Sequence, residues 1–198
     1  MDTKELANIL RNGGIAIIPT DTVYGMVCDA LSEEAVRKVY KLKQRDFNKP
    51  MIILVSNYEM LAKYTKNINS LQKELIDTYS PGPMTIILEK SELIPDIVTA
   101  AKEEVGIRIP NDERLRSLIK ELDRPIIATS ANVSSSETIT NVELLEDYIK
   151  DNVDYIYDGG TVKASASTIV KVIEDKISII REGDLANTIR EDYKNKIV

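Results

Sequence analysis

The stretch Gly13-Gly-Ile-Ala-Ile-Ile-Pro-Thr-Asp-Thr-Val-Tyr-Gly25 sets the pattern from which the fold class can be inferred. Its apolar, β-branched residues predict a buried strand over 15–19, which Pro19 ends. Thr20, Asp21 and Thr22 follow directly, and Gly25 permits a tight return of the chain. Two interpretations of these polar residues stay open: a functional loop at a strand end, or a turn whose hydroxyl groups bond their own backbone.

Runs of the same kind alternate with helical patterns along the whole chain. They predict about eight strands, over 15–19, 51–55, 85–88, 105–110, 126–129, 155–157, 168–173 and 177–181. Apolar residues at helical spacing follow Ser32, Ser70 and Asn141, which are residues typical of helix starts. Only two residues, 174 and 175, separate the last two strands, which indicates a hairpin and a mixed sheet. With no repeat or linker, residues 1–198 are expected to form a single α/β domain.

Composition narrows the chemistry that the chain can perform. It has 198 residues, 26 Lys and Arg against 32 Asp and Glu, a net charge of −6, and no histidine. The lack of histidine excludes Ser-His-Asp and Cys-His catalytic groups and histidine-containing zinc sites. The single cysteine, Cys28, cannot form an internal disulfide, and we interpret it as a small buried apolar group in a reducing cytosol. No apolar run approaches the roughly 20 residues that cross a bilayer, and no leader is recognisable, so a cytoplasmic protein without membrane association is expected.

A basic segment over residues 37–49 interrupts this acidic chain. Most of its charges are typical of a solvated helix face. Lys43 differs, because it continues the apolar stripe of the preceding helix and should point toward the sheet. No acidic residue at suitable local spacing comes before Asp46. We therefore expect an external anion to pair with Lys43 and Arg45.

Two later strands also carry polar residues that suit a ligand. Gly106 and Arg108 share one strand face, so a ligand could approach the backbone beside the guanidinium group. The alternative is a structural salt bridge from Arg108 to a glutamate at 103 or 104, or to another acid. Ser130 and Asn132 point the same way if the strand stays extended, and they suit phosphate or carboxylate oxygens. Helix capping or an Asx turn is the alternative for this pair.

The sequence has neither a P-loop nor a Gly-x-Gly-x-x-Gly fingerprint. The residues alone therefore indicate an anion-binding cleft at the ends of several strands, and they do not identify the anion. The residues of this cleft are Lys43, Arg45, Arg108, Ser130 and Asn132.

Together these segments resemble the YrdC/TsaC family, the L-threonylcarbamoyladenylate synthases of tRNA modification. Four ordered motifs carry the resemblance: Pro19-Thr-Asp-Thr-Val-Tyr-Gly25, Lys43 and Arg45 followed by Lys49-Pro50, Ser80-Pro-Gly-Pro-Met-Thr85, and Thr129-Ser-Ala-Asn132. Weaker agreement continues through 106–110, 165–168 and 180–183. The resemblance thus spans nearly the whole chain.

The resemblance implies a twisted open sheet flanked by helices around a large, concave cationic cavity, in the short single-domain form of the family. It implies an enzyme, a nucleotidyltransferase that converts ATP, L-threonine and bicarbonate to L-threonylcarbamoyl-AMP and pyrophosphate. Downstream transfer proteins would use this product to modify tRNA next to the anticodon. Mg²⁺ would accompany ATP without a dedicated protein site. Asp21 is the nearest candidate ligand, although a hydrogen bond within its own turn is the favoured interpretation.

The resemblance also implies roles for individual residues. Those expected to bind the nucleotide are Lys43, Arg45, Ser130, Asn132 and Arg181, with Lys43 and Arg45 as catalytic residues. Those expected to bind L-threonine are Thr20, Thr22, Arg108 and Ser167. Two departures from the family pattern affect these expectations: Asn111-Asp112 stands where members often carry histidine, and Ser134-Ser135 replaces the usual Ser-Gly.

Two alternative functions remain. An RNA-binding or ribosome-maturation module would use the basic segment, but the net charge of −6 and the lack of tryptophan oppose it. A carbamoyl-transfer domain that uses carbamoyl phosphate is opposed by the free-standing length and by the missing acylphosphatase and zinc segments. The synthase reaction suits a chain without histidine, because a threonine carbamate that attacks the α-phosphorus needs little proton transfer by the protein.

Overall fold

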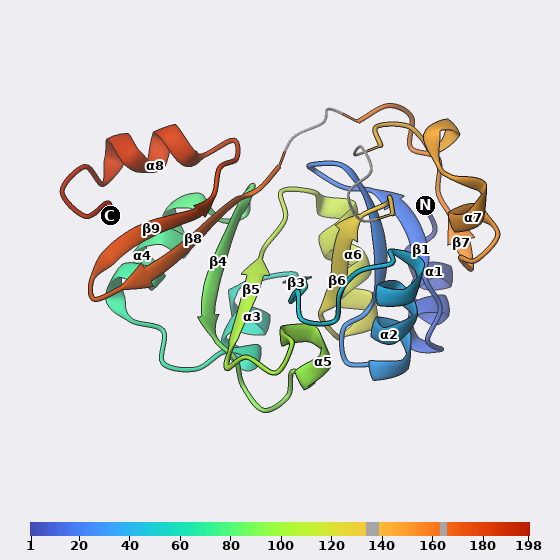
Figure 1. The fold of residues 1–198 in the computed structure, drawn as a ribbon, viewed down its shortest axis with the longest axis horizontal. Helices are drawn as coiled ribbons and strands as arrows, with labels where there is room; N and C mark the ends of the chain where they lie inside the picture. Colours follow the sequence, from blue (N-terminus) through green and yellow to red (C-terminus); the bar gives the residue numbers. More distant parts are fainter. Residues whose placement is uncertain (134–138, 163–165) are drawn as a thin grey trace.

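The computed structural model describes residues 1–133, 139–162 and 166–198. In this part of the chain, nine strands form one sheet in the order β7-β1-β2-β6-β3-β5-β4-β8-β9 (Figure 1). The strands are β1 (Ala16–Pro19), β2 (Tyr24–Asp29), β3 (Ile52–Leu54), β4 (Met84–Glu89), β5 (Glu104–Arg108), β6 (Ile126–Ser130), β7 (Tyr155–Ile156), β8 (Thr168–Ile173) and β9 (Lys176–Arg181). The helices are α1 (Thr3–Arg11), α2 (Glu33–Leu42), α3 (Tyr58–Tyr64), α4 (Ser70–Tyr79), α5 (Asp96–Thr99), α6 (Glu113–Leu122), the 3-10 helix η1 (Val142–Leu144), α7 (Asp147–Lys150) and α8 (Ala186–Asp192).

The sheet is mixed, as the sequence predicts. Three neighbouring pairs are parallel, β1 with β7, β3 with β5 and β4 with β8, and the other neighbours are antiparallel. The predicted hairpin of the last two strands is confirmed as β8 and β9. Its turn is tight because Glu174 and Asp175 both adopt positive φ angles, of 48° and 59°. The predicted α/β class is therefore confirmed.

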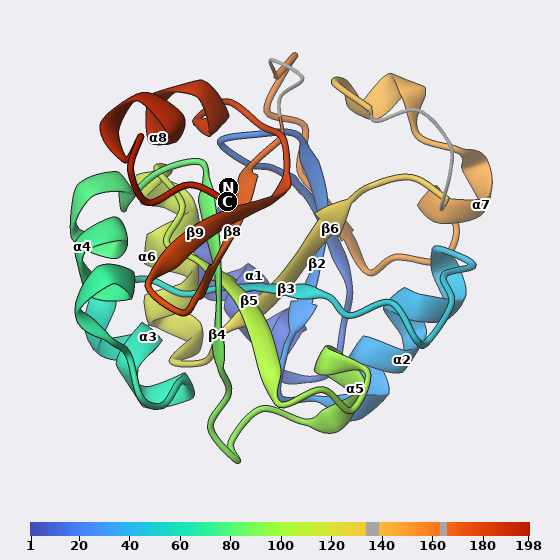
Figure 2. The same ribbon diagram turned by 60° about the vertical axis from the view of Figure 1, so that its left-hand side comes forward.

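Helices cover both faces of the sheet, because its central strands are apolar on both sides. In β1, Ala16 and Ile18 belong to a buried cluster with residues of α1 and α6, whereas Ile17 belongs to a larger cluster that includes residues of α2. Figures 1 and 2 show α2 and α5 on the near side of the sheet and α1 and α6 behind it. None of the described helices is long and apolar enough to cross a bilayer.

Two of the predicted helix starts are close to the observed ones. Ser32 caps α2, and its Oγ accepts a hydrogen bond from the backbone N–H of Ala35 at 3.3 Å. In α4 the cap is Asn69 rather than Ser70, because Asn69 and Gln72 form a reciprocal capping box. Both helices therefore start where their polar side chains satisfy the first free N–H groups.

The sequence does not predict β2, and the count of strands is wrong for that reason. Gly25 and Asp29 are poor strand formers, so this segment looks like part of a turn. In the structure, Gly25 pairs with Ile18 of β1, and the buried Asp29 pairs with Arg124, whose Nη1 lies 2.9 Å from Asp29 Oδ2. The tight return after β1 is thus a β-hairpin, and the polar turn 20–22 is its tip.

The helix predicted after Asn141 is shorter and broken. Asn141 caps only η1, the chain becomes extended at Leu145 with a ψ of 132°, and the short α7 follows. Leu145 and Ile149 are buried, while Leu144 and Tyr148 are exposed. The apolar periodicity therefore reflects two buried residues, Leu145 directly after η1 and Ile149 within α7, rather than one continuous helix.

Candidate functional site

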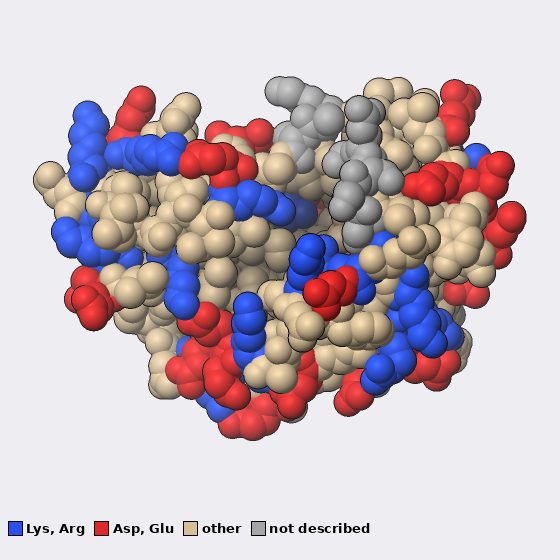
Figure 3. Space-filling view, viewed as in Figure 1, with Lys and Arg blue, Asp and Glu red and all other residues tan. Residues whose placement is uncertain are grey.

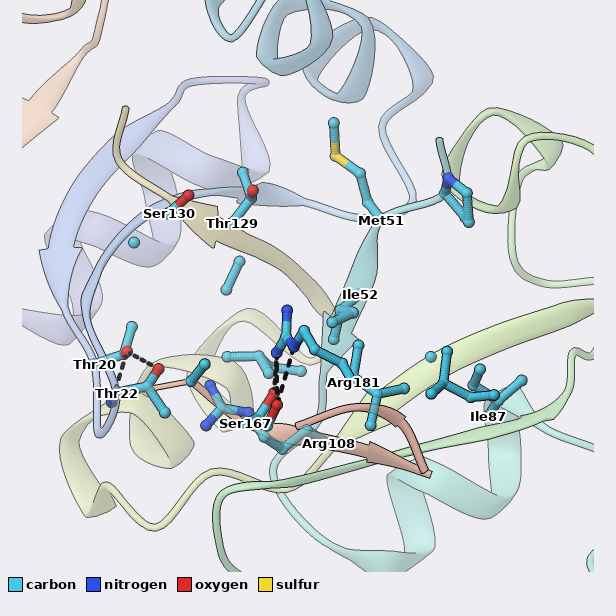
Figure 4. Close-up of a pocket in the computed structure, with 18 of the residues that line it drawn as sticks. Thr20, Thr22, Met51, Ile52, Ile87, Arg108, Thr129, Ser130, Ser167 and Arg181 are labelled. Carbon is cyan, nitrogen blue, oxygen red and sulfur yellow. Dashed lines mark hydrogen bonds between the residues drawn. The ribbon is translucent and has the colours of Figure 1, made fainter. Parts of the chain in front are cut away.

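A cavity of about 520 Å³ lies over the middle of the sheet, a volume typical of sites for small molecules and cofactors. Its walls come from β2 to β6, from β8 and β9, and from the turn 20–23. Figure 4 shows side chains from these separate elements turned toward one space. We call it the larger cavity. The predicted site residues on its walls are Thr20, Thr22, Arg45, Arg108, Ser130, Ser167 and Arg181.

A second cavity of about 340 Å³, the smaller cavity, is lined almost entirely by polar and charged side chains. Its residues are Lys43, Gln44, Arg45, Asp46, Lys49, Ser130 and Asn132. Arg45 and Ser130 line both cavities, so the two spaces are neighbours. Each predicted site residue therefore lines the larger cavity, the smaller cavity, or both.

Lys43 points inward, as its helical position predicts. Its side chain is 2% exposed, and its Nζ donates to the carbonyl oxygens of Ser130 and Asn132 at 2.5 and 2.6 Å and to Asn132 Oδ1 at 3.2 Å. Within the protein, three neutral oxygens at and just after the end of β6 solvate the ammonium group, because Lys43 caps the C-terminus of α2 and points toward them. They do not balance its positive charge, so the external anion as partner of Lys43 stays a prediction.

Burial also changes the acidity of this ammonium group. It lowers the pKa of Lys43 to about 8, and the positive charge of Arg45 acts in the same direction. Near neutral pH Lys43 is therefore mostly charged, with a proton that is held less firmly than in an exposed lysine. A negatively charged ligand in the smaller cavity would favour the charged form.

Ser130 and Asn132 lie together at the end of β6, and their side chains contact each other. Ser130 Oγ donates to Asn132 Oδ1, and the backbone N–H of Asn132 donates to Ser130 O at 2.9 Å. The chain thus turns immediately after the strand, held by one backbone bond and one bond between side chains, which is neither a helix cap nor an Asx turn. The residues Ser134 and Ser135, where the sequence departs from the family pattern, lie outside the described residues.

Arg45 is held by the loop that follows it. Its Nε and Nη2 donate to the carbonyl oxygens of Lys49 and Pro50 at 3.2 and 2.9 Å. The ring of Phe47 stacks on that of Tyr40 with centroids 4.7 Å apart, and the Tyr40 hydroxyl donates to Lys49 O at 2.9 Å. The two hydrogen bonds to Lys49 and Pro50 fix the orientation of the Arg45 guanidinium group. They use two of its five N–H donors, so other donors can bind a ligand.

Thr20 and Thr22 both line the larger cavity, and their hydroxyl groups stabilise the turn in which they stand. Thr20 Oγ1 donates to Val23 O at 2.7 Å and accepts from the backbone N–H groups of Thr22 and Val23. Because this bond uses the Thr20 proton, Thr22 is the donor in the 3.0 Å contact between the two hydroxyl groups. The interpretation as a turn whose hydroxyl groups bond their own backbone is therefore confirmed, and a functional role for this loop stays a prediction. Thr22 Oγ1, which donates its proton to Thr20, can still accept a hydrogen bond.

Arg108 forms a salt bridge to an acid that the sequence analysis did not pair with it. Its guanidinium Nη1 lies 3.0 Å from Asp21 Oδ1, and both side chains are at least 90% buried. Burial lowers the pKa of Arg108, and the charge of Asp21 opposes that shift. Asp21 Oδ2 accepts from the backbone N–H of Asn111 at 2.9 Å. The favoured interpretation, in which Asp21 accepts a hydrogen bond within its own turn, is therefore wrong, because its carboxylate accepts from Arg108 of β5 and from Asn111 in the loop after that strand.

Arg181 and Ser167 form a third hydrogen-bonded group on the cavity wall, and Figure 4 shows their contact. Arg181 donates to Ser167 O at 2.8 and 3.1 Å and to Ser167 Oγ at 2.7 Å. Ser167 Oγ also lies 2.9 Å from Thr85 Oγ1. Burial lowers the pKa of Arg181, and the positive charge of Arg108 adds to this effect. The two guanidinium groups are thus close enough to repel each other and would together attract an anion.

Sequence reasoning missed two charged residues of the larger cavity, Lys102 and Glu104. Nothing in their local spacing marks them, because they stand in and just before an ordinary strand. Glu104 is paired with Lys171 at 2.8 Å, so its charge is offset. Figure 3 shows Lys and Arg side chains around the hollow in the middle of this face, with most Asp and Glu nearer the periphery.

Comparisons with protein families, with individual proteins and with solved structures all give matches over most of the chain. The model of the Sua5/YciO/YrdC family, described as "Telomere recombination", matches residues 8–183. The chain is 47% identical over 175 residues to a protein of Methanocaldococcus jannaschii named "Putative threonylcarbamoyl-AMP synthase", a match that covers 88% of this chain and 82% of that protein. It is 33% identical over 180 residues to the threonylcarbamoyl-AMP synthase of Pyrococcus abyssi.

The lengths of these relatives differ. The match to the P. abyssi synthase covers 90% of this chain and 53% of that protein, so this chain spans about half of its length. The solved structure of P. abyssi Sua5 complexed with L-threonine superimposes with a TM-score of 0.89 at 30% identity, over 99% of this chain and 58% of that one. The similarity therefore covers the whole sheet and both cavities described above.

Proposed function

Because this chain belongs to the Sua5/YciO/YrdC family, we propose that it is a threonylcarbamoyl-AMP synthase that forms its product from ATP, L-threonine and bicarbonate and releases pyrophosphate. The observation that carries the proposal is the pair of neighbouring cavities that meet at Arg45 and Ser130. One cavity offers hydroxyl and guanidinium groups, and the other offers ammonium, guanidinium and amide groups. A reaction in which an amino-acid carbamate attacks the α-phosphorus of ATP and pyrophosphate leaves brings two anions together, and neighbouring cavities with cationic walls suit it.

The chemistry of the walls supports one placement of the substrates. We assign L-threonine to the larger cavity, where Arg108 complements its carboxylate and Thr22 accepts a hydrogen bond. The polyphosphate is assigned to the smaller cavity, which contains Lys43. The α-phosphorus then lies at the junction, beside Arg45 and Ser130.

The proposed chemistry runs in two steps. The amine of L-threonine first combines with bicarbonate to form the carbamate and water. A carbamate oxygen then forms a bond to the α-phosphorus of ATP, and the bond from that phosphorus to the bridging oxygen breaks. The electron pair leaves with pyrophosphate, so the reaction is an adenylyl transfer and the enzyme a nucleotidyltransferase.

The protein's contribution to this transfer is positional and electrostatic. Two anions, the carbamate and the polyphosphate, repel each other unless nearby cations offset their charges. Lys43 and Arg45 have fixed orientations, so little reorganisation is needed when charge moves to the leaving pyrophosphate. No step of this route needs a histidine.

We propose that Mg²⁺ enters with the nucleotide. Among the described residues, no group of three or more Asp, Glu, His or Cys side chains could hold a metal ion, and the carboxylate of Asp21 is bound to Arg108 and Asn111. Mg²⁺ commonly keeps several waters and binds substrate phosphates, so it would enter bound to the nucleotide and needs no cage of protein carboxylates. When bound, it would neutralise charge on the phosphate oxygens.

An RNA-binding module is not favoured by the geometry. A protein that binds RNA through its backbone presents lysine and arginine side chains on an accessible surface. Lys43 and Arg108 are instead 2% and 6% exposed and line the two cavities below the surface. We propose that the chain acts in the cytoplasm and passes its product to transfer proteins that modify tRNA.

Pyrophosphate release from ATP tests the proposed function. The purified chain should release pyrophosphate only when L-threonine and bicarbonate are both present, and the adenylate should appear in equal amount. Release without threonine, or release that carbamoyl phosphate supports equally well, would favour a different carbamoyl chemistry. Salt-sensitive RNA binding without turnover would favour the RNA-binding module.

A further inference from the structure

The contacts of Asp21 join two parts of the sheet that are not adjacent. Asp21 stands in the turn between β1 and β2, whereas Arg108 ends β5. In the sheet order, β6 and β3 lie between β2 and β5. The salt bridge of Asp21 to Arg108 at 3.0 Å therefore ties the turn 20–22 to β5 across the ends of two strands. Figure 2 shows the loop between β1 and β2, in blue, at the top of the sheet, reaching sideways from the end of β2.

Asp21 itself does not line either cavity, although both of its neighbours do. Thr20 and Thr22 face the larger cavity, and the Asp21 carboxylate turns away to bind Arg108 and the backbone N–H of Asn111. The carboxylate is 9% exposed. It therefore acts on bound ligands through the groups that it holds rather than by touching them.

We propose that Asp21 is a positioning residue for the amino-acid part of the site: it fixes Arg108 and the turn 20–22 relative to each other. This inference rests on the proposed synthase function. Without the carboxylate, the buried guanidinium group of Arg108 loses the charge that balances it and can leave its position on the wall. The turn 20–22 loses its link to β5 at the same time.

The nucleotide side of the site is held by different contacts. Lys43 is bound to the end of β6, and Arg45 is bound to the carbonyl oxygens of its own loop. None of these hydrogen bonds involves Asp21. Loss of Asp21 should therefore weaken L-threonine binding and leave ATP binding nearly unchanged.

The test is steady-state kinetics of Asp21→Asn, with calorimetry of L-threonine binding as a measurement independent of turnover. The amide keeps the shape and can accept one of the two hydrogen bonds, but it lacks the charge. We expect the KM and Kd for L-threonine to rise on the order of tenfold, which corresponds to the loss of one charge-assisted bond, and the KM for ATP to change by less than about twofold. For Asp21→Glu, which retains the carboxylate, the KM and Kd for L-threonine should lie between those of the wild type and those of Asp21→Asn.

Asp29→Asn is the matched control. Asp29 is also buried, and it is also paired with an arginine, Arg124, at 2.9 Å, but neither residue lines the larger or the smaller cavity. Asp29→Asn should lower the melting temperature without changing either KM.

If Asp21→Asn leaves the KM and Kd for L-threonine unchanged, or raises both KM values equally, the inference is wrong. Failure of the wild-type chain to bind L-threonine would overturn the inference and the proposed function together, whereas normal wild-type activity beside an unchanged Asp21→Asn would overturn the inference alone.

Discussion

Lys43 performs two tasks in one position. Its ammonium group satisfies three oxygens at the end of β6, and the same group lines the smaller cavity. An exposed lysine could not do this, because competing water would weaken each hydrogen bond. The buried lysine therefore supports the turn at Ser130, and under the proposed function it would also supply positive charge to the polyphosphate.

Removing this charge should impair turnover strongly. Lys43→Ala removes a preorganised cation beside the leaving pyrophosphate, a loss that typically raises the barrier by about 3 to 4 kcal/mol. We expect kcat/KM for ATP to fall on the order of a hundredfold or more, measured by pyrophosphate release. Lys41→Ala, in the exposed last turn of the same helix, should be indistinguishable from wild type. Near-normal turnover of Lys43→Ala in a folded protein would remove Lys43 from the mechanism.

The lowered pKa of Lys43 predicts how activity depends on pH. Below the pKa of about 8 the ammonium group is charged and attracts the polyphosphate, and above it the group becomes neutral. The value of kcat/KM for ATP should therefore fall as pH rises through about 8, since this parameter reports the free enzyme. In kcat the fall should come at higher pH, because bound phosphate favours the charged form.

Arg45→Gln provides the control for this profile. It removes the like charge that helps lower the pKa of Lys43, so the midpoint of the remaining activity should move to higher pH. A profile that stays flat from pH 7 to 10 in the wild type would show that Lys43 does not titrate in this range.

At the scale of secondary-structure elements, the site depends on how closely β9 and its following turn approach β8. A Cβ on Gly183 would lie 2.3 Å from Ala166 O and 2.4 Å from Thr168 N. Those backbone atoms flank Ser167, which contacts Arg181. Glycine is therefore required at 183 so that Ser167 can lie on the wall of the larger cavity.

Gly183→Ala should displace the segment around Ser167. Forcing an extra carbon against backbone atoms typically costs about 1 to 3 kcal/mol. We expect a lower melting temperature together with a raised KM for L-threonine. Gly13→Ala is the control for backbone strain without displacement of a neighbouring segment. Gly13 has a φ of 80°, which strains an alanine, but a Cβ there would lie 3.9 Å from the nearest atom and would displace nothing. That variant should lose about 1 kcal/mol of stability with unchanged kinetics.

The elements that the sequence predicted well are those governed by local rules. The apolar run 168–173 is observed unchanged as β8, and Ser32 starts α2, because apolar patterning and helix capping act over a few residues. The strand β2 escaped prediction because its stability comes from pairing with both β1 and β6. The helix after Asn141 is broken because tertiary packing of two buried residues outweighs helical periodicity.

In the candidate site, too, the sequence predicts features that depend on neighbouring residues and not the contacts between distant segments. The inward direction of Lys43 follows from its helical spacing, and the sequence alone predicts that polar residues at 130 and 132 follow a strand. It does not predict which groups these residues contact. The salt bridge of Arg108 to Asp21 spans 87 residues of sequence, and the carbonyl oxygens that bind Lys43 leave no mark in the side-chain pattern.

Over the whole molecule, the charge of −6 is unevenly distributed. Acidic side chains lie mostly at the periphery of the face in Figure 3, while the larger cavity is lined by Arg45, Lys102, Arg108 and Arg181. This arrangement keeps the surface acidic and places a local positive potential where two anionic substrates would meet. Net charge alone therefore says little about which ligands such a protein attracts.

The division into two cavities predicts that the two substrates can be perturbed separately. Lys49 lines only the smaller cavity, and Thr22 lines only the larger one. Lys49→Ala should weaken product inhibition by pyrophosphate severalfold without changing the KM for L-threonine, because a surface cation acts as a point charge on the phosphate. Thr22→Val should raise the KM for L-threonine without changing product inhibition by pyrophosphate, since it removes a hydrogen-bond acceptor on the wall of the larger cavity and leaves the phosphate contacts intact. The measurement is a full set of initial rates with ATP, L-threonine and pyrophosphate varied in turn. If either variant changed both constants equally, the two cavities would have to act as one continuous site, and the assignment of the α-phosphorus to their junction at Arg45 and Ser130 would be wrong.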